Sequence, residues 1–220
     1  LSFLLLPLKK IIGIPFELPF LAQATRGSVL DVGCGSGAKL KLAKSLGWEV
    51  AGLELDLNAV EVARAEGINV IHGDYKKLAQ FDSPFDCIIC SHVLEHVHDP
   101  VKLLELLAKS LKKNGVLLLS LPNAHSHLRV LYSEYWRGIE APRHVSIPEY
   151  ESLCKLLLGH GFELVKSVPI YNATLLDSQR ICKRRGEVSL LDYIKIKIFR
   201  IGLPLNSVET DITQLICFKT

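Results

Sequence analysis

The residues best suited to chemistry begin in the stretch SVLDVGCGSGAKL, residues 28–40, where Gly33, Gly35 and Gly37 follow an apolar run that carries Asp31. Glycines between a strand and a helix leave backbone N–H groups open to a ligand. The spacing is G-x-G-x-G, not the G-x-G-x-x-G of dinucleotide-binding folds, and no G-K-[ST] follows for a triphosphate. The loop therefore predicts a ligand that lies against the backbone without a pyrophosphate at the helix end.

Two further carboxylates end neighbouring apolar runs. Glu54 closes WEVAGLEL at 48–55, and Asp74 closes INVIHGD at 68–74. In a doubly wound sheet these positions lie beside the first loop, at the crevice where ligands bind. A carboxylate at Glu54 suits a ribose diol, and one at Asp74 suits an adenine amino group. Three strand ends thus predict an adenosine-shaped site.

A third group consists of histidines. SHVLEHVHDP places His92, Glu95 and His96 directly after the apolar run 85–90, and APRH adds His144. If the reaction involves a hydroxyl group, a histidine is the ordinary proton acceptor near neutral pH. The same side chains also suit zinc or a similar ion. The plainer alternative is a polar network at the start of a helix.

The elements that must position these residues follow from hydrophobic periodicity. Helices separated by apolar runs favour right-handed βαβ units and a parallel sheet covered on both faces, an α/β/α sandwich. The pattern predicts strands over 28–33, 48–55, 68–74, 85–90, 115–122, 162–168 and 211–219, and helices over 38–46, 58–66, 100–113 and 148–158.

In order and spacing, the motifs from residue 28 to about residue 123 strongly resemble those of class I S-adenosylmethionine-dependent methyltransferases. The later stretch YWRGIEAPRHVSIPEYESLCKLLLGHGFELV resembles their small-molecule branch, which includes ubiquinone-type O-methyltransferases and enzymes that modify sugars or lipid-linked metabolites. The resemblance implies a Rossmann-like, doubly wound sheet of seven strands. It also implies that the last strand lies antiparallel between the fifth and the sixth.

The resemblance further implies which residues contact the cofactor. The glycine loop would wall the methionine part, Asp31 would meet its amino group, and Glu54 would meet the ribose. Asp56 offers a competing carboxylate, but Glu54 aligns with the usual strand-end acid. The implied set is Asp31, Gly33, Cys34, Gly35, Gly37, Glu54, Leu55, Asp74, Tyr75, Ser91 and His92. The alternative is that the glycines form only a tight turn and that the acids are solvated.

Some relatives bind a metal through an acid-x-x-Glu-His motif and a later histidine. Here Glu95, His96 and His144 would be the ligands, but His92 stands where the first acid belongs, so a metal is not favoured. The catalytic candidates are His96 and His144, with His92 near the sulfonium. The substrate candidates are Trp136, Arg137, Arg143 and His144.

Composition sets the remaining bounds. The chain has 220 residues and a formal charge of +3, and its length predicts one domain. Its 6 scattered cysteines predict reduced thiols in the cytoplasm. The expected parts are an apolar segment 1–27, a cofactor core 28–121, a substrate lid 122–147, and a C-terminal part 148–220 with a basic insert 178–205. Prolines break the first segment below the roughly 20 residues of a span. Both outlying segments could still contact a membrane surface.

The sequence therefore predicts a methyltransferase that uses S-adenosylmethionine, releases S-adenosylhomocysteine and methylates a small molecule at a hydroxyl oxygen. A sugar- or lipid-linked acceptor is compatible with it. An RNA or protein methyltransferase is the first alternative, although the mild charge favours no nucleic acid. The second alternative is a non-catalytic regulatory or scaffold protein that binds the same cofactor.

Overall fold

A seven-stranded sheet forms the centre of the computed structural model, which describes residues 17–167, 174–184 and 212–220. The strand order is β3-β2-β1-β4-β5-β7-β6. The first five strands are parallel, and β7 lies antiparallel between β5 and β6. The predicted sheet and its antiparallel last strand are confirmed. The strands are β1 (Ser28–Val32), β2 (Glu49–Glu54), β3 (Asn69–His72), β4 (Phe85–Ser91), β5 (Leu111–Pro122), β6 (Phe162–Ser167) and β7 (Ile212–Lys219).

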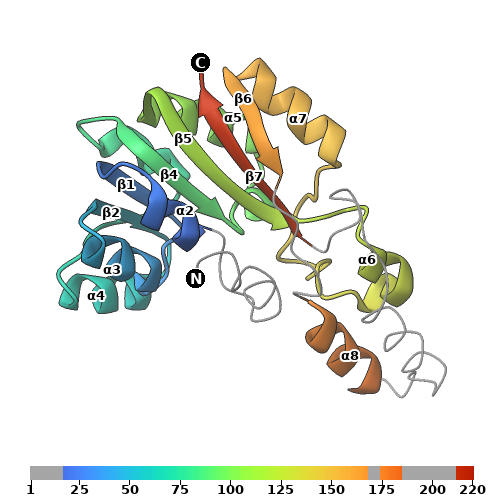
Figure 1. Cartoon of the computed structure of the whole chain (residues 1–220). Helices are drawn as coiled ribbons and strands as arrows, with labels where there is room; N and C mark the ends of the chain where they lie inside the picture. Colours follow the sequence, from blue (N-terminus) through green and yellow to red (C-terminus); the bar gives the residue numbers. More distant parts are fainter. Residues whose placement is uncertain (1–16, 168–173, 185–211) are drawn as a thin grey trace, which may run out of the picture.

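Helices cover both faces of this sheet, as the sandwich prediction requires (Figure 1). One face carries α2 (Glu17–Gln23), α3 (Ala38–Ser45) and α4 (Leu57–Ala65), and the other carries α5 (Pro100–Ser110) and α7 (Tyr150–Gly159). Two more helices, α6 (His127–Tyr132) and α8 (Leu175–Arg184), pack beyond the C-terminal end of β5. Three short 3-10 helices complete the described elements: η1 (Tyr75–Gln80), η2 (Leu94–His96) and η3 (Ser133–Tyr135).

The central strands β4 and β5 contain long apolar runs because both faces of the sheet are buried there. Along β4, Cys87 and Ile89 pack in the core under α2, α3 and α4, whereas Ile88 and Cys90 pack under α5 and α7. Alternation along a strand sends successive side chains to opposite faces. Cys87 and Cys90 therefore point to opposite faces of the sheet, and all six cysteines are free.

The predicted boundary between α5 and β5 is wrong. The helix expected over 100–113 ends at Ser110, and Leu111 begins β5 by pairing with Phe85. Leu111 is fully buried in this pairing, and the Nζ atom of Lys112 lies 2.8 Å from Oδ2 of Asp86. Burial of Leu111 in the sheet therefore outweighs the helical pattern of the lysine-rich stretch.

The sequence patterns predicted no helix at the positions of α6 and α8. Of the predicted basic insert 178–205, only residues 178–184 are described, and residues 1–16 of the apolar segment also lie outside the described part. Among the described helices, none combines the length and apolar character needed to cross a membrane.

Candidate functional site

The glycine loop after β1 is held against the end of β2. The N–H groups of Gly33 and Cys34 donate to the carbonyl of Leu53 at 2.8 and 3.2 Å. Gly33 has φ +74°, and a Cβ atom there would come within 2.7 Å of Cγ2 of Val93. At Gly35, φ is +54° and no atom lies within 4 Å of such a Cβ. The fold thus requires Gly33, whereas Gly35 leaves an open backbone surface.

Glu54, the last residue of β2, holds the loops of the first two strands together. Its Oε2 accepts from the N–H of Gly35 at 2.7 Å, and its Oε1 accepts from the N–H groups of Leu55 and Asp56 at 2.7 and 2.9 Å. A carboxylate offers about four acceptor sites, so one site on Oε2 remains for a ligand. The competing acid, Asp56, instead caps α4 through the N–H of Asn58.

The residues expected around an adenine lie at the adjoining strand ends. Leu55 is 69% exposed, and Asp74 caps η1 by accepting from the N–H of Lys76 at 3.0 Å. The N–H of Gly73 donates to the carbonyl of Glu54 at 2.9 Å, which joins the ends of β2 and β3. Tyr75 packs partly buried against the core under α5 and α7. The structure therefore gathers these residues beside the glycine loop.

A buried charge cluster lies beneath the loop. Asp31 is fully buried, neither carboxylate oxygen has a hydrogen-bond partner, and Oδ1 lies 3.5 Å from Nζ of Lys39. Burial raises the pKa of Asp31 from 3.8 to about 6, against the opposing pull of Lys39. Glu17 of α2 is also buried; its Oε1 lies 3.9 Å from the same Nζ and accepts from Oγ of Ser91 at 2.5 Å.

Glu17 and Lys39 were not identified from the sequence as site residues. The available signal was a single acid within the apolar run IIGIPFELPFL, residues 11–21. Its second oxygen, Oε2, is buried without a hydrogen-bond partner. Buried carboxylates ordinarily have partners, so such an atom needs an explanation.

A polar row continues from this cluster across the sheet. Ser91 of β4 pairs with Ser120 of β5, and Ser120 pairs with Gln214 of β7. Paired residues on neighbouring strands project from the same face. Ser120 and Gln214 are 1% and 3% exposed, and the Oγ and Oε1 atoms have no hydrogen-bond partner. The row thus offers unpaired polar atoms of Ser120 and Gln214 at the edge of the sheet where β4 and β5 end and the antiparallel β7 begins.

The structure brings together the two histidines expected to act in catalysis. Nδ1 of His96 lies 2.9 Å from the carbonyl oxygen of Arg143, and Nδ1 of His144 lies 2.6 Å from that of Gly138. A carbonyl oxygen only accepts, so both Nδ1 atoms carry a proton, and in the neutral form of each ring Nε2 is the acceptor. The ring centroids are 4.6 Å apart.

Glu95 lies beside these two histidines and also contacts His92. It is fully buried, its Oε1 lies 3.1 Å from Nδ1 of His92, and its Oε2 has no hydrogen-bond partner. Its backbone oxygen accepts from Val145 at 2.8 Å, which ties η2 to the segment around His144. Ligand atoms of Glu95, His96 and His144 all lie within 4.8 Å of one another. The three residues named as a metal set are therefore neighbours.

Glu140, which sequence reasoning missed, gathers the predicted substrate residues. Arg137 and Arg143 both form ion pairs with its carboxylate, and Nε2 of His144 lies 3.6 Å from Oε2. The hydrogen bond from Arg137 lowers the pKa of Glu140. Trp136 is buried and donates from Nε1 to Oγ1 of Thr174 at 3.0 Å. The Glu140 carboxylate thus offsets the positive charges of both arginines.

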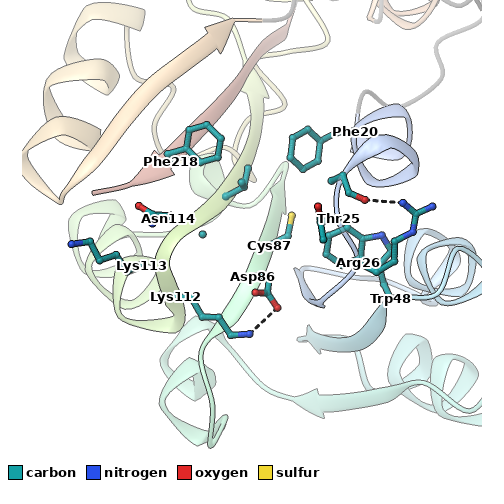
Figure 2. Close-up of a pocket in the computed structure, with 13 residues that line it drawn as sticks. Phe20, Thr25, Arg26, Trp48, Asp86, Cys87, Lys112, Lys113, Asn114 and Phe218 are labelled. Atoms are coloured by element: carbon teal, nitrogen blue, oxygen red, sulfur yellow. Dashed lines mark hydrogen bonds and ion pairs between the residues drawn. The ribbon is translucent and has the colours of Figure 1, made fainter.

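Cavities lie at both ends of the sheet. One of about 360 Å³ is lined by Arg129, Trp136 and His144 among others, beside the histidine cluster. Another, of about 390 Å³, lies at the opposite edge, where β4 and β5 begin (Figure 2). There Lys112 pairs with Asp86, and the guanidinium of Arg26 donates to backbone carbonyls. This second cavity is remote from the glycine loop.

Comparisons with known proteins agree with this geometry. A family model described as a methyltransferase domain matches residues 14–167. The ubiquinone biosynthesis O-methyltransferase of Xylella fastidiosa (strain M23) is 37% identical over 134 residues, which cover 55% of this chain and 54% of that protein. The chain thus spans about half the length of the curated relatives it matches.

Solved structures show the same fold at low identity. A SAM-dependent methyltransferase from Archaeoglobus fulgidus has a TM-score of 0.63 and 22% identity, with coverage of 93% of this chain and 90% of that chain. A mycolic acid cyclopropane synthase solved with SAH has a TM-score of 0.64 and 20% identity, with coverage of 92% and 82%.

Proposed function

Because the chain belongs to the methyltransferase domain family and has the class I fold, we propose that it methylates a small-molecule acceptor at a hydroxyl oxygen. S-adenosylmethionine would be the methyl donor. The observation that carries the proposal is the open glycine loop joined to the Glu54 carboxylate, with the Asp31 carboxylate beneath it lacking hydrogen bonds. The printed names of the sequence relatives, O-methyltransferases, support oxygen as the acceptor atom.

The site residues fit this cofactor. A cofactor sulfonium supplies a methyl group that is already attached to a good leaving group. The remaining acceptor site on Glu54 suits a ribose hydroxyl, and the two oxygens of Asp31 suit an ammonium group. Gly35 offers a surface free of side chains where the methionine part would lie. What the chain must add is alignment of the acceptor, which supplies much of the acceleration in such reactions.

His144 is the proposed proton acceptor. In the neutral ring, Nδ1 carries the proton and donates to the carbonyl of Gly138, which leaves Nε2 as the acceptor; the side chain is 5% exposed. An imidazolium formed there would face Oε2 of Glu140 at 3.6 Å, which would stabilise the charge. His96 lies against it at 4.6 Å and is the second candidate for this role. The unpaired Oγ of Ser120 and Oε1 of Gln214 would orient polar groups of the acceptor.

A divalent metal is the second candidate use of the same atoms. Glu95, His96 and His144 would hold it, and the buried, unpartnered Oε2 of Glu95 favours this arrangement. Such an ion would lower the pKa of an acceptor hydroxyl. An Nε2 atom that binds a metal cannot accept a proton, so the two uses exclude each other. Metal analysis of the purified protein, together with activity after chelation, decides between them.

We also propose a cytoplasmic location and a sugar- or lipid-linked acceptor. Six free thiols support a reducing, cytoplasmic compartment. The cavity of about 360 Å³ beside Trp136 and His144 offers a place for such an acceptor. Of the two segments proposed for membrane contact, residues 1–16 and 185–205 are not described.

The first test is calorimetric titration with S-adenosylmethionine, S-adenosylhomocysteine and, as a control, a nicotinamide dinucleotide. We expect micromolar binding of the first two alone. Transfer of a labelled methyl group is then measured on hydroxylated small molecules, RNA and protein substrates. Transfer only to RNA or protein would replace the small-molecule proposal, and binding without any transfer would favour a regulatory or scaffold protein. No binding to folded protein would refute the proposal.

A further inference from the structure

Three charged side chains lie together under the glycine loop, although they come from three different elements. Glu17 lies in α2, Asp31 in β1 and Lys39 in α3. Nζ of Lys39 is 3.5 Å from Oδ1 of Asp31 and 3.9 Å from Oε1 of Glu17. Both acids are almost fully buried, whereas the side chain of Lys39 is 23% exposed. The lysine thus lies at the open side of the group.

The contacts within this group leave several carboxylate oxygens without hydrogen bonds. The single lysine faces two carboxylates across distances longer than a charge-assisted hydrogen bond of roughly 2.7–2.9 Å. Three buried carboxylate oxygens, both of Asp31 and Oε2 of Glu17, have no hydrogen-bond partner. Meanwhile Ser91 donates to Oε1 of Glu17 and fixes that carboxylate in place. Two buried carboxylates that share one lysine at 3.5 and 3.9 Å are incompletely compensated, so the arrangement favours a further cationic donor.

An α-amino acid carries both charges that this group would complement. Its ammonium has three donors, which match the three unpaired oxygens, and its carboxylate needs a cation at the open side. We propose that Glu17 and Asp31 bind the ammonium of the methionine part of the cofactor, while Lys39 binds its carboxylate. This inference rests on the proposed function and adds Glu17 and Lys39 to the cofactor site. Lys39 would occupy the place of the ammonium until the cofactor arrives, and then turn to the carboxylate.

Three adenosine ligands distinguish binding of the ammonium from binding of the carboxylate. S-adenosylhomocysteine has both the ammonium and the carboxylate, its decarboxylated form keeps only the ammonium, and 5′-methylthioadenosine has neither. Their dissociation constants are measured by calorimetry on the full chain and on Glu17→Gln and Lys39→Met. Lys41→Met is the matched control, because Lys41 lies on the same helix but pairs with Glu66 at the surface.

Each variant has a distinct expected pattern. Glu17→Gln weakens S-adenosylhomocysteine and its decarboxylated form by about tenfold or more, equal to about 1.4 kcal/mol. Lys39→Met weakens S-adenosylhomocysteine by a similar factor but leaves the decarboxylated form unchanged or tighter, because the competing lysine is gone. Binding of 5′-methylthioadenosine stays within about twofold in both variants, since it makes no contact with the group. Lys41→Met changes none of the three.

Two outcomes overturn the inference: no change in any affinity, or an equal loss for all three ligands, which would mean that the ion group only supports the fold. Thermal unfolding of each variant is recorded alongside. Should Lys39→Met not fold, Lys39→Gln provides the same comparison. If the unmodified protein binds none of the three ligands, the proposed function itself fails. If it binds them and the variants do not discriminate, only the assignment of Glu17 and Lys39 fails.

Discussion

Replacement of Glu54 by glutamine is the sharpest perturbation of the cofactor site. The carboxylate accepts from three backbone N–H groups, those of Gly35, Leu55 and Asp56. A glutamine amide has one oxygen and one NH₂ group, so whichever way it turns, a donor faces at least one of these N–H groups. The variant therefore loses the acceptor for the ribose and also disturbs the loop that carries Gly35.

The size of the effect follows from these contacts. A hydrogen bond to a charged group contributes about 1.5–3 kcal/mol to stability or binding. Loss of one such bond to a ribose hydroxyl therefore weakens S-adenosylhomocysteine roughly 10- to 150-fold. The lost bonds within the loop add a decrease in the free energy of unfolding on the order of 1–3 kcal/mol, because donors are left facing a donor.

The assay is calorimetric titration with S-adenosylhomocysteine, paired with urea unfolding of the same samples. Asp56→Asn is the matched control: it removes a charge two residues away, yet asparagine still caps α4. We expect that control to bind within about twofold of the unmodified protein. If Glu54→Gln binds equally well, or if both variants weaken binding alike, the assignment of the ribose to Glu54 is refuted.

Three further predictions concern the neighbouring residues. The pKa of Asp31 is raised from 3.8 to about 6, so the folded state holds its proton more tightly than the unfolded state between these values, and ionisation destabilises the fold as pH rises through them. Asp31→Asn should therefore gain stability relative to the unmodified protein between about pH 4 and pH 7, by on the order of 3 kcal/mol in urea unfolding; a constant difference would contradict this. His144→Ala should lower methyl transfer about 100-fold while S-adenosylhomocysteine binding stays within about twofold, and unchanged turnover would remove its role as a base. Gly35→Ala should lower the free energy of unfolding by about 1–2 kcal/mol because of its left-handed backbone, and it should weaken cofactor binding. Gly33→Ala should lower the free energy of unfolding further, because its Cβ atom would also clash with Val93. The reverse order of the two variants would refute both assignments.

Much of the fold could be predicted because its signals are local. The apolar run of 85–90 alternates between two cores, and the helix face of α5 repeats at helical spacing, so both are visible in a short window of sequence. The end of α5 could not be predicted in this way. Leu111 joins the sheet because Phe85, far away in the sequence, lies beside it, and such pairing does not show in the residues around it.

Some residues of the candidate site could likewise be predicted from local sequence, and others could not. The sequence alone determined the glycine loop and the acids at the ends of β2 and β3, because a parallel sheet brings its carboxyl ends to one edge. Only the tertiary structure placed Glu17 against Ser91, 74 residues away, and the backbone of Glu95 against that of Val145 beside His144. It also showed that the carboxylate oxygens of Asp31 lack hydrogen-bond partners. The physical reason is that strand periodicity is a property of neighbouring residues, whereas burial and ion pairing depend on which distant segments the sheet brings into contact.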